Sequence, residues 1–161
     1  MTANPRTLSK QKTSFRIGDP DGQYSIYSGE GARRVAGRWH TLGQPVIYTS
    51  EHYSTAMLEK LVHYNGILPD NQHYLEITIP AGTTYEVFSN THVPDWHIEN
   101  CAASREFGKD WFTSGRSCIL IVPSVVARLD NNILINTTHS DFAGIEAVLE
   151  TPIWWDDRLF S

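Results

Sequence analysis

Cysteine is scarce in this chain. Its two cysteines, Cys101 and Cys118, share no short metal-binding spacing and cannot form the disulfide framework of a small secreted domain. Free thiols of this kind are typical of a reducing compartment. We therefore expect a cytoplasmic protein that is stabilised by an apolar core without covalent cross-links.

Long apolar runs are also absent. The longest, from Cys118 to Ala127, is interrupted by Pro123 and Ser124 and is far shorter than the roughly 20 residues of a membrane-spanning helix. Residues 1–12 are polar and basic and have no apolar segment typical of a signal peptide. These features predict a soluble intracellular protein that does not enter a membrane.

Basic residues are outnumbered, with 13 Lys and Arg against 18 Asp and Glu, which gives a net charge of −5. This balance disfavours direct nucleic-acid binding and a nuclease function, because an acidic chain offers no extended positive surface to bind a polyanion. Any anion site must be local and built from a few arginines. The composition is otherwise that of an ordinary globular protein, and we expect a loose tail over residues 1–13 and a single domain over residues 14–161.

Hydrophobic periodicity predicts short strands mixed with helices. The expected strands are residues 15–17, 46–49, 73–79, 85–88, 117–122 and 133–135. The expected helices are residues 53–64 and 102–113, the second weakened by Gly108. The expected connections are a glycine-rich loop at 28–34, extended chain at 125–129, a turn at 130–132 and a docked C-terminal segment at 154–160. Because strands and helices do not alternate as βαβ units, this order indicates an α+β fold.

Three chemically distinct groups follow one another in the first half of the chain. Residues 37–40 are Gly-Arg-Trp-His, residues 45–50 form a short apolar strand that carries Tyr48, and Glu59 lies on the next expected helix. They would place a phosphate-binding cation, an aromatic ring and a carboxylate around one cleft. A nucleotide with a cleavable glycosidic bond needs these three groups.

Six segments in this order resemble the RES-domain toxins, a family named for its Arg, Glu and Ser. They are Gly-Arg-Trp at 37–39, Pro-Val-Ile-Tyr-Thr-Ser at 45–50, Ala-Met-Leu-Glu at 56–59, Val-Pro-Ser at 122–124, Asn-Ile-Leu-Ile-Asn at 132–136 and Asp-Arg-Leu-Phe at 157–160. The resemblance extends from Phe15 to Phe160. It departs from the family at His40, where members often carry Asn, and at Thr137, where they often carry Pro.

The resemblance implies an ADP-ribosyltransferase-like fold, with a core of short mixed strands and flanking helices. It implies a toxin that degrades NAD or, in some members, transfers ADP-ribose to a protein. It also implies an antitoxin of the DNA-binding Xre type, which we expect to cover the active-site cleft near Arg38 and either Arg16 or Arg33. NAD is the expected substrate, and no metal is predicted.

Arg38, Tyr48 and Glu59 are the expected catalytic residues. Arg38 would bind the pyrophosphate or the nicotinamide ribose, and Tyr48 would present its ring or hydroxyl to the same part of NAD. Glu59 would stabilise positive charge on the ribose as the nicotinamide bond lengthens. The remaining candidates for binding NAD are Arg16, Tyr27, Trp39 and Ser124, with Ser124 expected to bind a phosphate or the carboxamide and not to act as a nucleophile, since no G-x-S-x-G elbow surrounds it.

These residues also have ordinary interpretations. Tyr48 could be strand packing, and Glu59 could be a solvated residue paired with His63. Glu59 and His63, with His52 nearby, could instead form a metal site. The favoured function is a growth-arresting toxin that cleaves the nicotinamide–ribose bond of NAD by hydrolysis or phosphorolysis. The alternatives are ADP-ribosyl transfer to a host protein and a non-catalytic interaction domain in which Arg38 and Glu59 form a structural ion pair.

Overall fold

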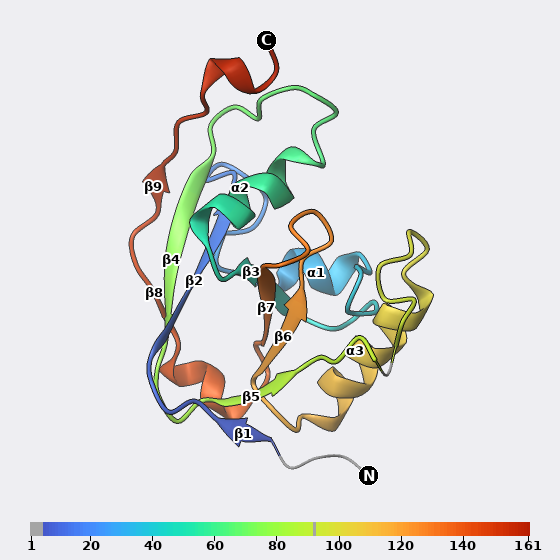
Figure 1. The fold of residues 1–161 in the computed structure, drawn as a ribbon. Coiled ribbons are helices and arrows are strands. Elements are labelled where there is room, and N and C mark those ends of the chain that lie inside the picture. Colours follow the sequence, from blue (N-terminus) through green and yellow to red (C-terminus); the bar gives the residue numbers. More distant parts are fainter. Residues whose placement is uncertain (1–4, 92) are drawn as a thin grey trace.

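The computed structural model of the chain describes residues 5–91 and 93–161, and one mixed β-sheet runs through it (Figure 1). The sheet has the order β1-β5-β6-β7-β3-β2-β4-β8, and β9 also pairs with β4. The strands are β1 Arg6–Thr7, β2 Lys12–Gly18, β3 Val46–Ser50, β4 His73–Ile79, β5 Thr84–Val87, β6 Ile119–Pro123, β7 Asn131–Asn136, β8 Glu146–Ala147 and β9 Thr151–Pro152. The pairing of β5 with β6 is parallel, and the other pairings are antiparallel.

Helices flank the sheet, as expected for an α+β fold. They are α1 Glu30–Arg34, α2 Tyr53–Leu61, α3 Ala102–Ser114 and the 3-10 helices η1 Ser140–Gly144 and η2 Asp157–Leu159. Helix α3 ends at Gly115, whose φ of 61° is the left-handed conformation that commonly terminates a helix. Among the described helices, none is long and apolar enough to cross a membrane.

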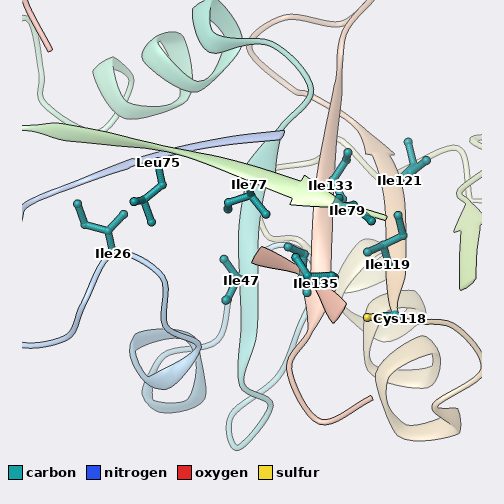
Figure 2. Close-up of a cluster of buried hydrophobic side chains, with 11 residues drawn as sticks. Ile26, Ile47, Leu75, Ile77, Ile79, Cys118, Ile119, Ile121, Ile133 and Ile135 are labelled. Carbon is teal, nitrogen blue, oxygen red and sulfur yellow. The ribbon is translucent and has the colours of Figure 1, made fainter. Parts of the chain in front are cut away.

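The central strands β3, β6 and β7 are buried on both faces. Alternate side chains enter two separate clusters, because successive residues of a strand point to opposite faces. Ile47, Ile119 and Ile135 face the side chains of β4 in one cluster (Figure 2). Val46, Leu120 and Leu134 face the other way, toward α3 and its buried Trp111. Burial on both faces explains the continuous apolar runs that predicted these strands.

The sheet divides between β2 and β3. In the described chain these two strands pair at Phe15 and Ser50 alone, whereas β2 pairs with β4 along its whole length. Beyond that point the Arg16 guanidinium bridges the gap, since its Nη1 donates to the Tyr48 carbonyl oxygen at 2.8 Å. The divergence leaves room for side chains of β2, β3 and α2 to surround a pocket.

Several local expectations are corrected. Strand pairing begins at Arg6, so residues 6–13 are not a loose tail, and the expected loop at 28–34 contains α1. Residues 125–129 form turns instead of extended chain, and the expected turn at 130–132 includes the start of β7. The C-terminal segment docks through Trp155, whose Nε1 donates to the Pro69 carbonyl oxygen at 2.8 Å, while Trp154 is 85% exposed.

At Gly108 the helix α3 packs against the backbone of the 37–40 segment. A Cβ at this position would overlap the Trp39 carbonyl oxygen and lie 2.5 Å from its carbonyl carbon. The interpretation of Gly108 as a weak point of the helix is therefore incomplete, because its missing side chain lets α3 pack directly against the backbone of Trp39.

Candidate active site

The segment at 37–40 is a turn closed by an isolated antiparallel β-bridge between Gly37 and His40, and it contacts both α3 and β3. The Gly37 N–H donates to the His40 carbonyl oxygen, and Arg105 Nε donates to the Gly37 carbonyl oxygen at 2.7 Å. A Cβ on Gly37 would lie 2.7 Å from the His40 ring and 2.8 Å from the Tyr48 hydroxyl oxygen. Glycine at this position therefore lets both rings approach the backbone.

His40, which is buried, and Tyr48, which is half-buried, form a hydrogen-bonded pair. His40 Nε2 lies 2.7 Å from the Ala32 carbonyl oxygen and 2.8 Å from that of Val35, so Nε2 carries the proton. Nδ1 must then accept the Tyr48 hydroxyl proton across 2.7 Å, and the same hydroxyl accepts the Trp39 N–H at 3.0 Å. Burial raises the pKa of Tyr48, which keeps the phenol protonated at neutral pH.

Burial also lowers the pKa of His40, although its two carbonyl contacts act in the opposite direction. Near the lowered pKa the unfolded chain binds more protons at His40 than the folded chain does. The contribution of His40 to the free energy of unfolding is therefore fully present above about pH 6.5 and is lost as the pH falls through the lowered folded pKa. We expect urea unfolding between pH 5 and 7.5 to be less pH-dependent in His40→Asn than in the unmodified protein. An equal slope in both would contradict this assignment, and His97→Asn, at an exposed position, is the control.

The Glu59 carboxylate projects from α2 and is held from one side. Its Oε1 accepts hydrogen bonds from Ser124 Oγ and from Asn132 Nδ2, each at 2.7 Å. Among the described residues no hydrogen bond to Oε2 occurs, and Glu59 lines two adjoining pockets. One carboxylate oxygen is thus fixed and the other is left for a ligand.

Arg38 and Arg16 bring positive charge to these pockets. Arg38 Nη1 donates to the carbonyl oxygens of Trp96 and Ile98, each at 3.0 Å. Arg16 Nε donates to the Ile26 carbonyl oxygen at 2.7 Å, in addition to its bond to Tyr48. Since these contacts are to neutral carbonyls, both guanidinium charges remain available to an anion. Within the described chain, Arg38 and Glu59 form no ion pair.

The larger pocket has a volume of about 620 Å³, within the range of small-molecule sites, and the smaller one about 190 Å³. The larger is lined by Gly37, Arg38, Trp39, Tyr48, Glu59, Val62, His63, Cys101, Pro123, Val125, Val126 and Asn132. Tyr48, Glu59, His63 and Asn132 line both pockets. The two spaces therefore adjoin at the Glu59 carboxylate.

The structure brings most of the expected site residues together. Arg38, Trp39, Tyr48 and Glu59 line the larger pocket and Arg16 the smaller one. Trp39 is nevertheless almost fully buried, and its ring stacks on Trp96 in the core.

Two expected ligand-binding residues line neither pocket. Ser124 is fully buried and contacts Glu59 instead of an open space. Tyr27 packs on Phe142, and its hydroxyl donates to the Ile145 carbonyl oxygen at 3.4 Å. Asn132 was not among the expected site residues, because Asp-Asn-Asn is typical of a turn. In the part of the chain that the structure describes, no three His, Cys, Asp or Glu side chains are grouped to hold a metal.

The fold and the pocket define an α+β protein whose cleft is lined by Arg, Tyr and Glu. In a solved structure described as the M. tuberculosis MbcT–MbcA toxin–antitoxin complex, one chain shares this fold with a TM-score of 0.70. The two chains are 15% identical, and the match covers 90% of this chain and 85% of the other.

Sequence comparison places the chain in a family. Residues 13–156 match the RES domain. A Sphingobium protein named Prs ADP-ribosylating toxin is 38% identical over 82% of this chain and 85% of its own length. A Photorhabdus laumondii protein named Toxin Res is 35% identical over 73% of this chain and 77% of its own length. The chain therefore belongs to the RES toxin family.

Proposed function

We propose that this chain is a toxin that breaks the bond between nicotinamide and ribose in NAD and thereby depletes NAD in the cell. The observation that carries the proposal is the Glu59 carboxylate. Two donors hold one of its oxygens, and the other accepts no hydrogen bond from the described residues and lies beside pockets that carry the charges of Arg38 and Arg16. Loss of nicotinamide leaves an oxocarbenium-like ribose, which an adjacent carboxylate stabilises.

In the proposed reaction the bond from ribose C1′ to the nicotinamide nitrogen breaks, and its electron pair returns to the ring, which leaves as neutral nicotinamide. Glu59 Oε2 faces the positive charge on C1′. Arg38 binds the phosphates or the adjoining ribose, and the Tyr48 ring faces the nicotinamide. Water or phosphate then adds through oxygen to C1′ and gives up a proton, which yields ADP-ribose or its phosphorylated form.

The test is to incubate purified, antitoxin-free protein with NAD, with and without phosphate, and to measure nicotinamide by chromatography. We expect nicotinamide release, and its dependence on phosphate distinguishes phosphorolysis from hydrolysis. No release from folded protein under either condition would contradict NAD cleavage with these acceptors.

ADP-ribosyl transfer is the second candidate, because the Sphingobium relative is named as an ADP-ribosylating toxin. The same site can serve both reactions, since they differ only in the group that attacks C1′. Labelled NAD added to a cell lysate distinguishes them. A discrete labelled protein supports transfer, whereas free ADP-ribose or its phosphate alone supports degradation.

An antitoxin that covers the larger pocket is the proposed partner. The MbcT–MbcA structure is a toxin–antitoxin complex, and its similarity to this chain supports a partner of that class. The Xre type is part of the proposal and follows from the family resemblance. Exposed apolar side chains, including Val62 at 53% and Val126 at 36%, line the same pocket as Arg38. Such a lining suits an apolar segment with a carboxylate that reaches the arginine.

Val62→Asp is expected to weaken antitoxin binding by about tenfold or more, because it places a charge among these apolar side chains. Arg33→Glu is the control. Arg33 was expected near the cleft mouth, but it lines neither pocket and pairs with Glu30 on the exposed surface of α1. Calorimetry with a purified cognate antitoxin measures both affinities. If Val62→Asp leaves the affinity unchanged and Arg33→Glu lowers it strongly, the antitoxin binds at α1 and not over the larger pocket.

A further inference from the structure

Asn132 connects Glu59 to the sheet through both ends of its amide. Its Nδ2 donates to Glu59 Oε1, and its Oδ1 accepts the Ser50 hydroxyl proton, each at 2.7 Å. Ser50 and Asn132 are directly opposite each other in the pairing of β3 with β7. Ser50 is buried, and it is also the β3 residue that pairs with β2 where the sheet divides. The amide is therefore anchored where β3 pairs with both β2 and β7.

The orientation of this amide follows from hydrogen-bonding capacity. An ionised carboxylate accepts hydrogen bonds and donates none. Turning the amide over would place Asn132 Oδ1 against Glu59 Oε1, oxygen against oxygen. The Ser50 hydroxyl can serve as the donor that the amide oxygen requires. With Ser124 as the second donor, the arrangement holds Oε1 and leaves Oε2 without a hydrogen bond from the described residues.

We infer that Asn132, anchored by Ser50, is the positioning residue that aims the Glu59 carboxylate at the reacting ribose carbon. The inference rests on the proposed cleavage of NAD. Asn132 acts by holding Glu59 in one rotamer with a single free oxygen, which is the preorganisation that stabilises developing charge. Its contribution belongs to the chemical step more than to binding, so its loss affects kcat more than KM.

The discriminating variant is Asn132→Asp, because the introduced carboxyl resembles the amide in shape and can donate only when it is protonated. At pH 8 both carboxyls are ionised and repel each other, and we expect kcat about 100-fold below that of the unmodified protein. At pH 5.5 a shared proton restores the hydrogen bond, and the deficit narrows to about tenfold.

Asn131→Asp is the matched control, on the same strand and one residue away, where the side chain contacts Glu51 instead of Glu59. Its kcat is expected to stay within about twofold of the unmodified value at both pH values. If Asn132→Asp shows the same deficit at pH 5.5 and pH 8, or raises KM alone, the inference is wrong. Should that variant not fold, Ser50→Ala replaces it, with an expected tenfold loss in kcat and a KM within about threefold. Unchanged kcat in folded Ser50→Ala would equally overturn the inference.

A measurement without NAD separates this inference from the proposed function. In the ligand-free protein, NMR should show one Asn132 side-chain N–H proton exchanging with solvent more slowly than those of Asn131. Glu59→Ala should abolish that difference. Slow exchange in a protein that neither releases nicotinamide nor labels a protein would contradict the proposed function while retaining the Asn132–Glu59 contact. Equal exchange at both asparagines would contradict the contact itself.

Discussion

Glu59→Gln is expected to lower nicotinamide release by about 10³-fold and to abolish growth inhibition, while the protein remains folded. Glutamine has the shape of glutamate, and its amide oxygen can still accept the hydrogen bonds of Ser124 and Asn132. What is lost is the negative charge opposite the ribose carbon, and removal of one such electrostatic contribution typically lowers kcat by about 10²–10³-fold. Chromatography of the reaction products and a growth assay measure the two effects.

Glu51→Gln is the matched control, because Glu51 pairs with Lys12 at 3.1 Å and lines neither pocket. It should leave nicotinamide release unchanged. If folded Glu59→Gln remains fully toxic, the carboxylate has no catalytic role and a non-catalytic interaction domain becomes the better interpretation. The absence of an Arg38–Glu59 ion pair among the described contacts already removes the structural role proposed for that pair.

The elements of the fold were predictable where burial leaves a periodic signal. Residues 73–79 alternate because β4 has one face in the core, and residues 117–122 are continuously apolar because β6 is covered on both faces. Short elements at the edges were less predictable. Strand β1 has two residues, both exposed, so its pairing with β5 leaves no hydrophobic pattern in the sequence.

The site was predictable in its residue types and less so in its contacts. Arg38, Tyr48 and Glu59 lie around one pocket, as their order suggested. The sequence did not indicate that Ser124 is turned toward Glu59 or that Asn132 joins it, because both contacts depend on the pairing of distant strands. Tyr27 resembles Tyr48 in its sequence surroundings, yet the fold places it against Phe142, away from both pockets.

Gly108 shows how a local rule can mislead. Glycine inside a helix is less favourable than alanine by about 1 kcal/mol, so sequence alone suggests that Gly108→Ala would stabilise α3. The structure reverses the sign, because the added methyl group would overlap the backbone of Trp39. Neither the Trp39 backbone nor α3 can move freely, since Trp39 packs against Trp96 and Phe107 in the same core cluster.

Gly108→Ala is therefore expected to destabilise the fold by about 3 kcal/mol, the upper end of the usual cost of overpacking. For a domain of this size that corresponds to a fall in Tm of about 6–12 °C. Thermal unfolding followed by circular dichroism measures the change, with Gly31→Ala as the matched control. Gly31 is also helical, but a Cβ there would meet only Tyr24 Cδ2 at 3.9 Å, so that substitution should be neutral or slightly stabilising.

The same substitution should also reduce activity in the molecules that remain folded. Any shift of Trp39 moves its N–H away from the Tyr48 hydroxyl and moves the adjoining Arg38 at the pocket wall. Nicotinamide release per folded molecule of Gly108→Ala, assayed well below its Tm, is expected to fall by about tenfold or more, since small displacements of positioned groups strongly affect rate. A variant that melts at the same temperature as the unmodified protein, or that melts lower but retains full activity, would show that α3 does not hold the Arg38 segment in place.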